Sequence, residues 1–329
     1  MELIVDPNEL SEKSRKRQEA IKQRRQRLSR KPAKVPTELA RSGMFRPTKQ
    51  YLNQQTTSYT LEVGNWAKIS VVGKELGIAH KDTLMAVFRQ NARTIMDNSP
   101  ESSQIEKWGI AAKTKSVVYT TWRGLLQAQN KSAHVNNITT QAGLLEDLSS
   151  LIVSFRIHEG RRGGGSGSLI EVLFDGFELD SRVQISYGQH VKQIMAAKQI
   201  VYLDAEAYYT LKSDYAKAFF SFIDSQPNNS WVDESILAQI VGRDIWRENW
   251  QQRGDFRKYC VRAFNDFEAS GYLRNVQRVP YKSGKNTCFR FEYEFCKPKQ
   301  KDLFPCDPSE VIRGTFPFTP DPSIDTSCG

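Results

Sequence analysis

The sequence lacks the features that would place it in a membrane or in an oxidising compartment. Its 329 residues contain no run of about 18 apolar residues, so no membrane-spanning helix is expected. The first ten residues are acidic and lead into a polar stretch, unlike a secretory signal. The five cysteines are odd in number and have no Cys-x-x-Cys spacing, which indicates neither a disulfide framework nor a zinc module. We therefore expect a protein of the reducing bacterial cytoplasm that does not bind membranes.

The sequence also lacks a catalytic motif. The four histidines lie far apart and without metal-ligand spacing: His80, His134, His158 and His190. No His-apolar-His pair accompanies a tyrosine, so metal-dependent nicking of DNA is not indicated. There is no Gly-x-Ser-x-Gly or paired-carboxylate motif, and the glycine-rich loop at 160–168 lacks the Gly-Lys-Ser/Thr end of a nucleotide-binding loop. We expect no enzyme, no cofactor and no metal.

Positive charge is abundant, but it is concentrated in one segment. The chain carries 47 Lys and Arg against 37 Asp and Glu, a net charge of +10. Residues 11–34 hold 11 of these cations and 2 acids, a net charge of +9, while the first ten residues carry −3 and residues 35–329 carry +4. Residues 10–31 predict a charged helix without an apolar stripe. This helix is either an arm that contacts a polyanion or a solvated tail.

The predicted elements of residues 50–195 suggest a first domain. Strands at 59–63 and 66–72 form a hairpin around Gly64-Asn65. Helices are predicted at 81–97 and 114–130 from their apolar spacing, and strands at 151–157 and 169–174 flank the glycine-rich loop. The two last strands would form a long hairpin with a flexible, basic tip.

Residues 196–297 predict a second domain with a clearer order of elements. Helices are expected at 204–212, 213–225, 233–241 and 254–270, followed by strands at 272–281 and 287–295. Helix, helix, recognition-type helix and hairpin is the order of a winged helix-turn-helix. The predicted fold class is α+β, with two tandem winged helix-turn-helix domains. A basic N-terminal helical arm and linker occupies 1–49, and a proline-rich, disordered tail occupies 298–329.

The predicted helix 254–270 has the two faces that a DNA-reading helix needs. One stripe is apolar: Phe256, Cys260, Ala263, Phe264 and Phe267. Another face is basic and polar, and we predict that its side chains read DNA in the major groove: Arg253, Arg257, Lys258, Arg262 and Asn265. The competing interpretation is an ordinary amphipathic helix whose solvated face is basic.

Further DNA-contacting residues are predicted on the hairpin tips and on the first domain. Lys282 and Lys285 lie at the turn of the second hairpin, where they can reach phosphates, although the turn can equally be a plain polar one. The matching candidates of the first domain are Lys113, Lys115 and Arg123, on or directly before the helix predicted at 114–130, and Arg161 and Arg162 at the tip of the long hairpin.

A short motif in the tail suggests a protein partner. Gln300, Leu303 and Phe304 could fill one polar and two apolar pockets of a partner, which is the usual logic of a short linear peptide. The alternative is that these residues fold back onto the domain.

With these elements in place, the sequence resembles plasmid replication initiators, most nearly the TrfA type of broad-host-range plasmids. The stretch Ala40-Arg41-Ser42-Gly43-Met44-Phe45 is similar to that family's Ala-Arg-Ser-x-x-Phe entry to the first domain. The first wing of that family resembles residues 150–174, in which a basic hairpin joins the runs 150–156 and 169–174. The Leu-Ser-x-x-Ala-x-x-x-Phe helix of its second domain resembles residues 211–219. The resemblance covers roughly residues 40–275.

The resemblance implies tandem winged helices that bind directly repeated sites (iterons) in the double-stranded DNA of a plasmid origin. Such initiators open an adjacent AT-rich segment, recruit the host helicase and other host replication proteins, and commonly limit copy number through dimers. Members of the TrfA type carry a sliding-clamp-binding pentapeptide of the form Gln-x-Ser/Asp-Leu-Phe. Gln300–Phe304 is similar to it, but it lies C-terminal here rather than before the first domain.

Two other functions are compatible with the same residues. The first is a transcriptional repressor that uses the same domains without initiating replication. The second is an adaptor whose winged helices bind protein while the arm alone touches nucleic acid. Under the adaptor reading, deletion of residues 1–34 would abolish DNA binding.

Overall fold

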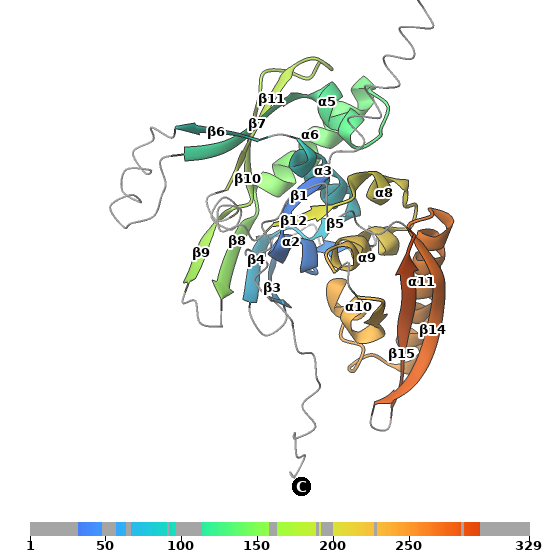
Figure 1. The fold of residues 1–329 in the computed structure, drawn as a ribbon. Helices are drawn as coiled ribbons and strands as arrows, with labels where there is room; N and C mark the ends of the chain where they lie inside the picture. The colour runs from blue at the N-terminus through green and yellow to red at the C-terminus, as the bar shows by residue number, and fades with distance from the viewer. Residues whose placement is uncertain are drawn as a thin grey trace, which may run out of the picture. The chain divides into compact units, whose positions relative to one another are not determined.

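The computed structural model is an α+β fold of helices and mainly antiparallel sheets (Figure 1). It describes residues 32–47, 57–63, 67–90, 92–96, 114–157, 163–188, 191, 200–226, 229–283 and 286–296. All of these belong to one compact unit within residues 1–296. Across these ranges, every helix is too short or too polar to traverse a bilayer.

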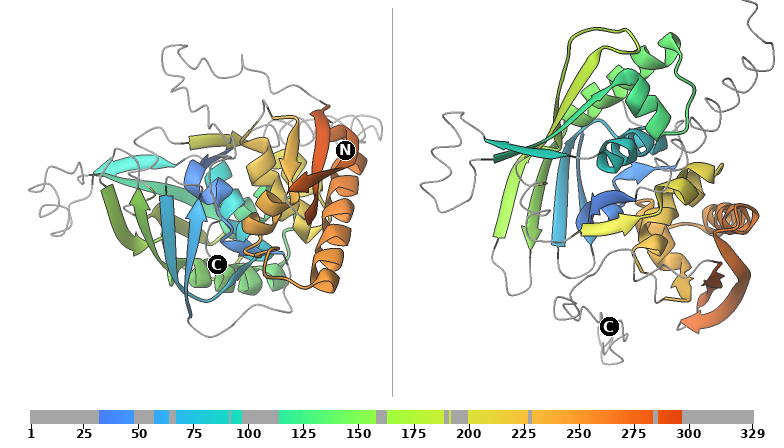
Figure 2. Two further views of the ribbon diagram at one scale, coloured as in Figure 1. Left: turned by 90° about the horizontal axis from the view of Figure 1, so that it is seen from below. Right: turned by 45° about the horizontal axis from the view of Figure 1, so that its top comes forward.

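Residues 200–296 contain the four predicted helices and the hairpin in the predicted order, together with two short strands that the sequence does not predict. The helices are α8 (Ala205–Thr210), α9 (Asp214–Asp224), α10 (Glu234–Ile240) and α11 (Trp250–Ala269). The strands are β12 (Ile200–Leu203), β13 (Trp231–Asp233), β14 (Leu273–Ser283) and β15 (Asn286–Phe295). The last three strands form one sheet in the order β13-β15-β14. Helix α11 lies alongside the β14–β15 hairpin in both views of Figure 2.

Capping residues explain where these helices begin and end. The Ser213 hydroxyl accepts a hydrogen bond from the amide of Ala216 and so caps α9. Asn249 and Gln252 form a reciprocal capping box at the start of α11, at 2.9 and 3.1 Å. Gly271 ends α11 with a φ of +68°, the left-handed conformation that glycine adopts without steric cost. Helix α11 begins four residues before the predicted position because the capping box lies at 249–252.

The N-terminal region contains two four-stranded sheets. Its strands are β3 (Thr57–Val63), β4 (Ala67–Gly73), β5 (Leu76–Gly77), β6 (Arg93–Met96), β7 (Thr114–Thr121), β8 (Ile152–Ile157), β9 (Gly163–Ser168), β10 (Ile170–Phe174) and β11 (Arg182–Tyr187). Its helices are α3 (Ile78–Arg89), α5 (Trp122–Ala128) and α6 (Val135–Ser149). The sheet orders are β3-β4-β8-β9 and β10-β11-β7-β6.

The two helices predicted in this region are partly wrong. The helix predicted at 81–97 ends at Arg89, and β6 follows it, because Arg93–Met96 pairs with Thr114–Val117. The helix predicted at 114–130 is a strand up to Thr121 and a helix only from Trp122, because β7 pairs with both β6 and β11. The Thr121 hydroxyl accepts from the amide of Gly124 and so caps the shortened helix. Lys115 therefore lies on a strand.

The predicted long hairpin of the first domain is also wrong. Strand β8 pairs with Gly163–Ser168, which the sequence assigns to a loop, and not with the strand at 169–174. That strand, β10, pairs instead with β11. Strand pairing uses backbone groups alone, so a run of Gly and Ser can complete a sheet edge despite its weak strand propensity. In the first hairpin, Val63 pairs with Ala67, so three residues separate the strands rather than Gly64-Asn65 alone.

Residues 33–46, which the sequence assigns to an arm and linker, are part of the folded unit. They form β1 (Ala33–Pro36), α2 (Thr37–Arg41) and β2 (Phe45–Arg46), and β1 pairs with β12 of the C-terminal region. Arg41 contacts the Ser225 hydroxyl at 3.2 Å, beyond the end of α9. Arg46 Nη1 donates to the Val241 carbonyl at 2.6 Å, beyond the end of α10. The segment thereby satisfies polar groups at the ends of two helices that lie far away in the sequence.

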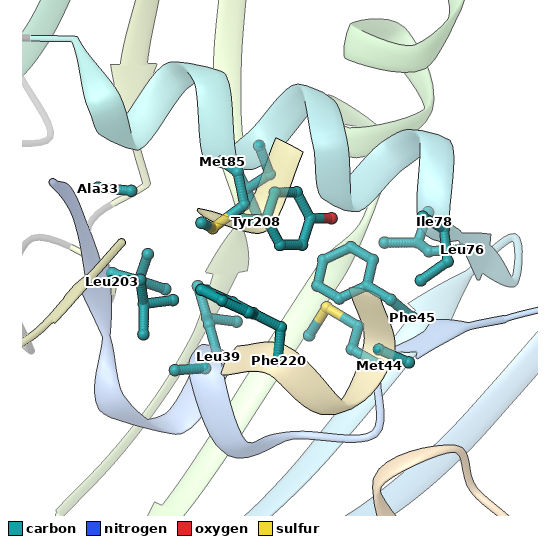
Figure 3. Close-up of a cluster of buried hydrophobic side chains, with 14 of the residues drawn as sticks. Ala33, Leu39, Met44, Phe45, Leu76, Ile78, Met85, Leu203, Tyr208 and Phe220 are labelled. Atoms are coloured by element: carbon teal, nitrogen blue, oxygen red, sulfur yellow. The ribbon is translucent and has the colours of Figure 1, made fainter. Parts of the chain in front are cut away.

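Apolar side chains of this segment join the N-terminal and C-terminal regions in one core (Figure 3). Leu39, Met44 and Phe45 are at most 4% exposed. Figure 3 shows them clustered with residues of α3 and β5 and with residues of the C-terminal region: Leu76, Ile78, Met85, Leu203, Tyr208 and Phe220. The two regions therefore share buried apolar surface, which stabilises them together.

A buried polar network connects the same two regions beside this core. The Lys217 ammonium contacts both carboxylate oxygens of Asp82 at 3.1 and 3.0 Å, and the Tyr208 hydroxyl donates to Asp82 Oδ1 at 2.8 Å. Lys81 Nζ donates to the carbonyls of Lys217 and Ala218 at 2.7 and 3.0 Å. The network joins α3 to α8 and α9, and its polar groups satisfy one another because water is excluded.

We predict that Lys81 makes the stability of the protein depend on pH. Burial lowers the pKa of Lys81 from 10.5 to about 7. Between these values the unfolded chain binds more protons than the folded one, so the free energy of unfolding should rise with pH. A neutral amine keeps two N–H donors for its two carbonyl acceptors. Urea unfolding at about pH 7 and about pH 9 should show this rise in the wild type and a smaller rise in Lys81→Met. An equal rise in both proteins would contradict the prediction.

Candidate nucleic-acid interface

Helix α11 has the division into buried and exposed faces that its sequence predicts. Its five predicted core residues are at most 1% exposed, and Phe264 stacks on Phe291 of β15 with ring centroids 4.3 Å apart. Lys258, Arg262 and Asn265 lie on the exposed face. Among the described residues, the Lys258 ammonium has one ion-pair partner, the half-exposed Asp255, at 2.9 Å. Arg262 and Asn265 make no hydrogen bond or ion pair with any residue that the structure describes, so they are available to a ligand.

A shallow basic groove runs between α11 and the hairpin. Its lining residues are Gly254, Arg257, Lys258, Val261, Arg262, Arg278 and Phe289. The guanidinium groups of Arg257 and Arg278 lie 4.6 and 4.5 Å from the centre of the Phe289 ring. Four of these side chains are cationic, which makes the groove suited to a polyanion such as a nucleic-acid backbone. We name this surface, together with Asn265, the basic groove.

Arg278 and Phe289 are residues of this groove that the sequence prediction omits. Both lie in the hairpin, Arg278 on β14 and Phe289 on β15. The alternation of Phe289, Phe291, Tyr293 and Phe295 is a period-two signal for one sheet face, and it could have indicated Phe289. Arg278 had no such signal, because its position beside α11 depends on how the hairpin packs.

Arg257 is held by protein groups rather than free to read bases. It makes two hydrogen bonds of 2.8 Å to the carboxylate of Glu234 and a third, of 3.0 Å, to the Thr287 carbonyl. Glu234 is 2% exposed, and its hydrogen bonds raise the pKa of Arg257. Arg257 thus ties α11 to α10 and β15, and this geometry favours a positioning role over the base contact that the sequence suggested.

Of the remaining predicted residues of α11 and the hairpin, one has a protein partner, one is exposed and one lies outside the described residues. Arg253 Nε donates to the Glu248 carbonyl at 3.0 Å, so it fixes the turn before α11. Lys282 is exposed near the end of β14. Lys285, at the tip of the same hairpin, lies outside the described residues. The structure therefore brings Lys258, Arg262 and Asn265 together and gives Arg253 a local contact.

The predicted residues of the first domain do not form a described site. Arg123 makes a two-pronged ion pair with Asp180 at 2.8 and 2.9 Å on the surface, which raises the pKa of Arg123. Lys115 lies on β7, seven residues before α5 begins, and it has a partner of its own. Lys113, Arg161 and Arg162 lie outside the described residues, as do Gln300, Leu303 and Phe304 of the tail. Contacts by these residues stay predictions.

No grouping of three or more His, Cys, Asp or Glu side chains in the described ranges is arranged to hold a metal ion. His80 lies beside Asp147, which also pairs with Lys74, and each nitrogen of the His80 ring has a local hydrogen-bond partner. Nδ1 accepts from the Gly77 amide at 3.1 Å, so Nε2 carries the proton and donates to Asp147 at 3.3 Å. Burial lowers the pKa of His80, which favours this neutral form. This geometry is that of a helix cap at the start of α3.

Two of the solved structures that match this chain are of one protein, RctB. A crystal structure of selenomethionine derivatives of domains 2 and 3 of RctB has a TM-score of 0.51 and 8% sequence identity, over 80% of this chain and 99% of that chain. A second crystal structure of RctB domains 2–3 has a TM-score of 0.47 and 8% identity, over 79% of this chain and 97% of that one. No model of a known protein family matches the chain, and no curated protein matches it in sequence. The first of these similarities shows a fold shared with domains 2 and 3 of RctB, and it does not single out the TrfA type.

Proposed function

We propose that the protein is a replication initiator, without enzymatic activity, that binds repeated sites in double-stranded origin DNA through the basic groove. The observation that carries the proposal is the exposed face of α11, where Lys258 and Arg262 line one groove with Arg278 of the hairpin and Asn265 follows them on the helix. The order α9, β13, α10, α11, β14, β15, with β13 paired to β15, supports a winged helix-turn-helix in this region. The fold similarity to RctB, a replication initiator, points to the same class.

The proposed mechanism divides the work between phosphate and base contacts. Lys258 and Arg278 would neutralise phosphates and hold the duplex against the hairpin. Arg262 and Asn265 lie three residues apart on the exposed face, where Arg can pair with guanine edges and Asn with adenine. Deformation of neighbouring AT-rich DNA would then lower the cost of melting it. In this mechanism, one set of side chains holds the DNA backbone and another set recognises the base sequence.

The wider cellular role is proposed from the family resemblance. The N-terminal region would act as a second winged helix on the next part of the same site, and the arm with its net charge of +9 would add sequence-independent attraction. The proposal also includes recruitment of the host helicase, initiator and sliding clamp. The protein would form homodimers that limit copy number, and it would be located in the cytoplasm, associated with DNA.

Replacement of Arg262 by alanine tests the proposal. We expect Arg262→Ala to weaken binding to the DNA site that the wild-type protein protects in a footprint by about 1–3 kcal/mol. It should also relax specificity at one base pair, because a guanidinium that pairs with a base edge is lost. The measurement is a titration of labelled duplexes carrying the site, single-base variants of it and a scrambled sequence.

Arg274 offers a matched control for this experiment. It is an exposed arginine of β14 that pairs with Glu294 at 3.0 Å outside the basic groove. Arg274→Ala should bind the site like the wild type. If Arg262→Ala binds the site and the scrambled DNA as the wild type does, α11 is not the reading helix.

A further inference from the structure

Trp250 is the most exposed large apolar side chain among the residues that the structure describes. Its exposed fraction is 85%, whereas the fully buried Trp122 has none. Its indole makes no aromatic or cation–π contact with any other described side chain. A fully solvated indole has a free energy cost because its large apolar surface stays in water. An exposed aromatic of this kind is suited to a ligand that covers it.

The position of Trp250 places it on the same helix face as the basic groove. It is the first residue of α11 and precedes Gly254 by four residues, Arg257 by seven and Val261 by eleven. Residues at these intervals lie on one face of an α-helix. A Cβ added at Gly254 would meet no atom within 4 Å, so the space between Trp250 and the groove is open. A duplex that follows the groove would pass over the indole.

The backbone under Trp250 is fixed. The capping box of Asn249 and Gln252 closes the first turn of α11 around this residue. Arg253 anchors the preceding turn through the Glu248 carbonyl at 3.0 Å. An aromatic side chain on a fixed backbone loses little conformational entropy when a ligand covers it, which favours a stacking platform.

We infer that Trp250 stacks on a nucleobase at the end of the DNA segment that α11 reads, and that it unstacks this base from its neighbour. The inference rests on the proposed function. It commits to DNA as the occupant because the adjoining basic groove carries Lys258, Arg262 and Arg278, which are complementary to a polyanion. Every base has an apolar face on which an indole can stack, and an inserted aromatic side chain opens a base step. The recognised chemical group is therefore a partly unstacked base in duplex DNA.

The experiment compares three variants of the full chain on the site footprinted with the wild type. Trp250→Ala should weaken binding to this duplex roughly tenfold or more, while Trp250→Phe should stay close to the wild type. Trp231→Ala is the matched control, since Trp231 is 44% exposed but lies on β13 under Arg290. The affinity of Trp231→Ala for the duplex should equal that of the wild type. Thermal melting should be the same for wild type and Trp250→Ala, because the side chain is solvated.

Permanganate probing at saturating protein then reports the unstacked base. In duplexes that carry thymine in turn at each position of the footprint edge, the wild type and Trp250→Phe should make one of these thymines reactive, and Trp250→Ala should not. Equal affinity and an equal permanganate pattern for Trp250→Ala and wild type would overturn the inference and assign the indole to another occupant, such as a protein. The absence of any sequence-specific footprint with the wild type would instead overturn the proposed function.

Discussion

Arg257→Ala is expected to destabilise the protein by about 3–5 kcal/mol, although Arg257 lines the surface that we propose for DNA. The substitution leaves the carboxylate of Glu234, which is 2% exposed, without the two hydrogen bonds that neutralise it. An unpaired charge in this environment costs more free energy than the pair contributes, because water cannot reach it. Urea unfolding followed by circular dichroism measures the loss.

Two further variants separate the loss of the ion pair from the loss of side-chain volume. The double variant Arg257→Met with Glu234→Leu removes both charges and should recover most of the stability. Lys258→Ala removes the neighbouring exposed cation and should change stability by less than about 0.5 kcal/mol. If Arg257→Ala is as stable as Lys258→Ala, then the Glu234–Arg257 contact does not position α11.

This prediction changes how binding data for the basic groove are to be read. A loss of DNA affinity in Arg257→Ala would accompany a displaced helix, since Arg257 also bonds the Thr287 carbonyl of the hairpin. A loss in Arg262→Ala has no such origin, because Arg262 bonds no described residue. The two arginines are five residues apart on one helix, and only their partners distinguish positioning from reading.

The C-terminal region could be predicted because its signals are local. The apolar residues of α11 recur at helical spacing, its end is marked by Gly271, and the hairpin follows directly in the sequence. These features depend on neighbours within a few residues, which a single sequence displays. The exposed face of α11 followed from the same periodicity.

The N-terminal region could not be predicted in the same way because its structure depends on distant pairing. The spacing of Val118, Trp122, Leu125 and Leu126 fits a helix, yet β11, more than 60 residues away, pairs with residues 117–121. Helix α6 was missed because its start, with Asn136, Asn137, Thr139 and Thr140, is rich in poor helix formers. Burial of Ile138, Ala142, Leu145 and Leu148 outweighs that propensity.

The contacts of the candidate site residues could not be predicted either, because they join residues far apart in the sequence. Glu234 and Arg257 are 23 residues apart, and neither their pairing nor the burial of Glu234 is visible in the sequence. The pairing of β1 with β12 joins residues about 170 positions apart. Sequence periodicity therefore indicated which face of α11 is exposed, but only the fold showed which of its cations has a protein partner.

Asp82→Ala is expected to reduce the free energy of unfolding by about 3–5 kcal/mol and to loosen both regions of the folded unit together. Asp82 is 8% exposed, and its removal leaves the Lys217 ammonium and the Tyr208 hydroxyl without their acceptor. Asp82→Asn keeps an oxygen for Tyr208 and should lose less. Asp180→Ala, which breaks the fully solvated pair with Arg123, should leave the urea midpoint unchanged.

Hydrogen exchange distinguishes a shared unit from two independent ones. Because α3 shares this network and the core of Figure 3 with α8 and α9, Asp82→Ala should accelerate amide exchange in all three helices. In the background of Lys217→Met, the same substitution should cost less, since the charge that Asp82 neutralises is already gone. Faster exchange confined to α3 would contradict the coupling. Coupled exchange, together with the proposed function, would mean that the two regions meet DNA in one fixed geometry. Inserting a few base pairs within the bound site should then disrupt binding by rotating one contact surface away from the other.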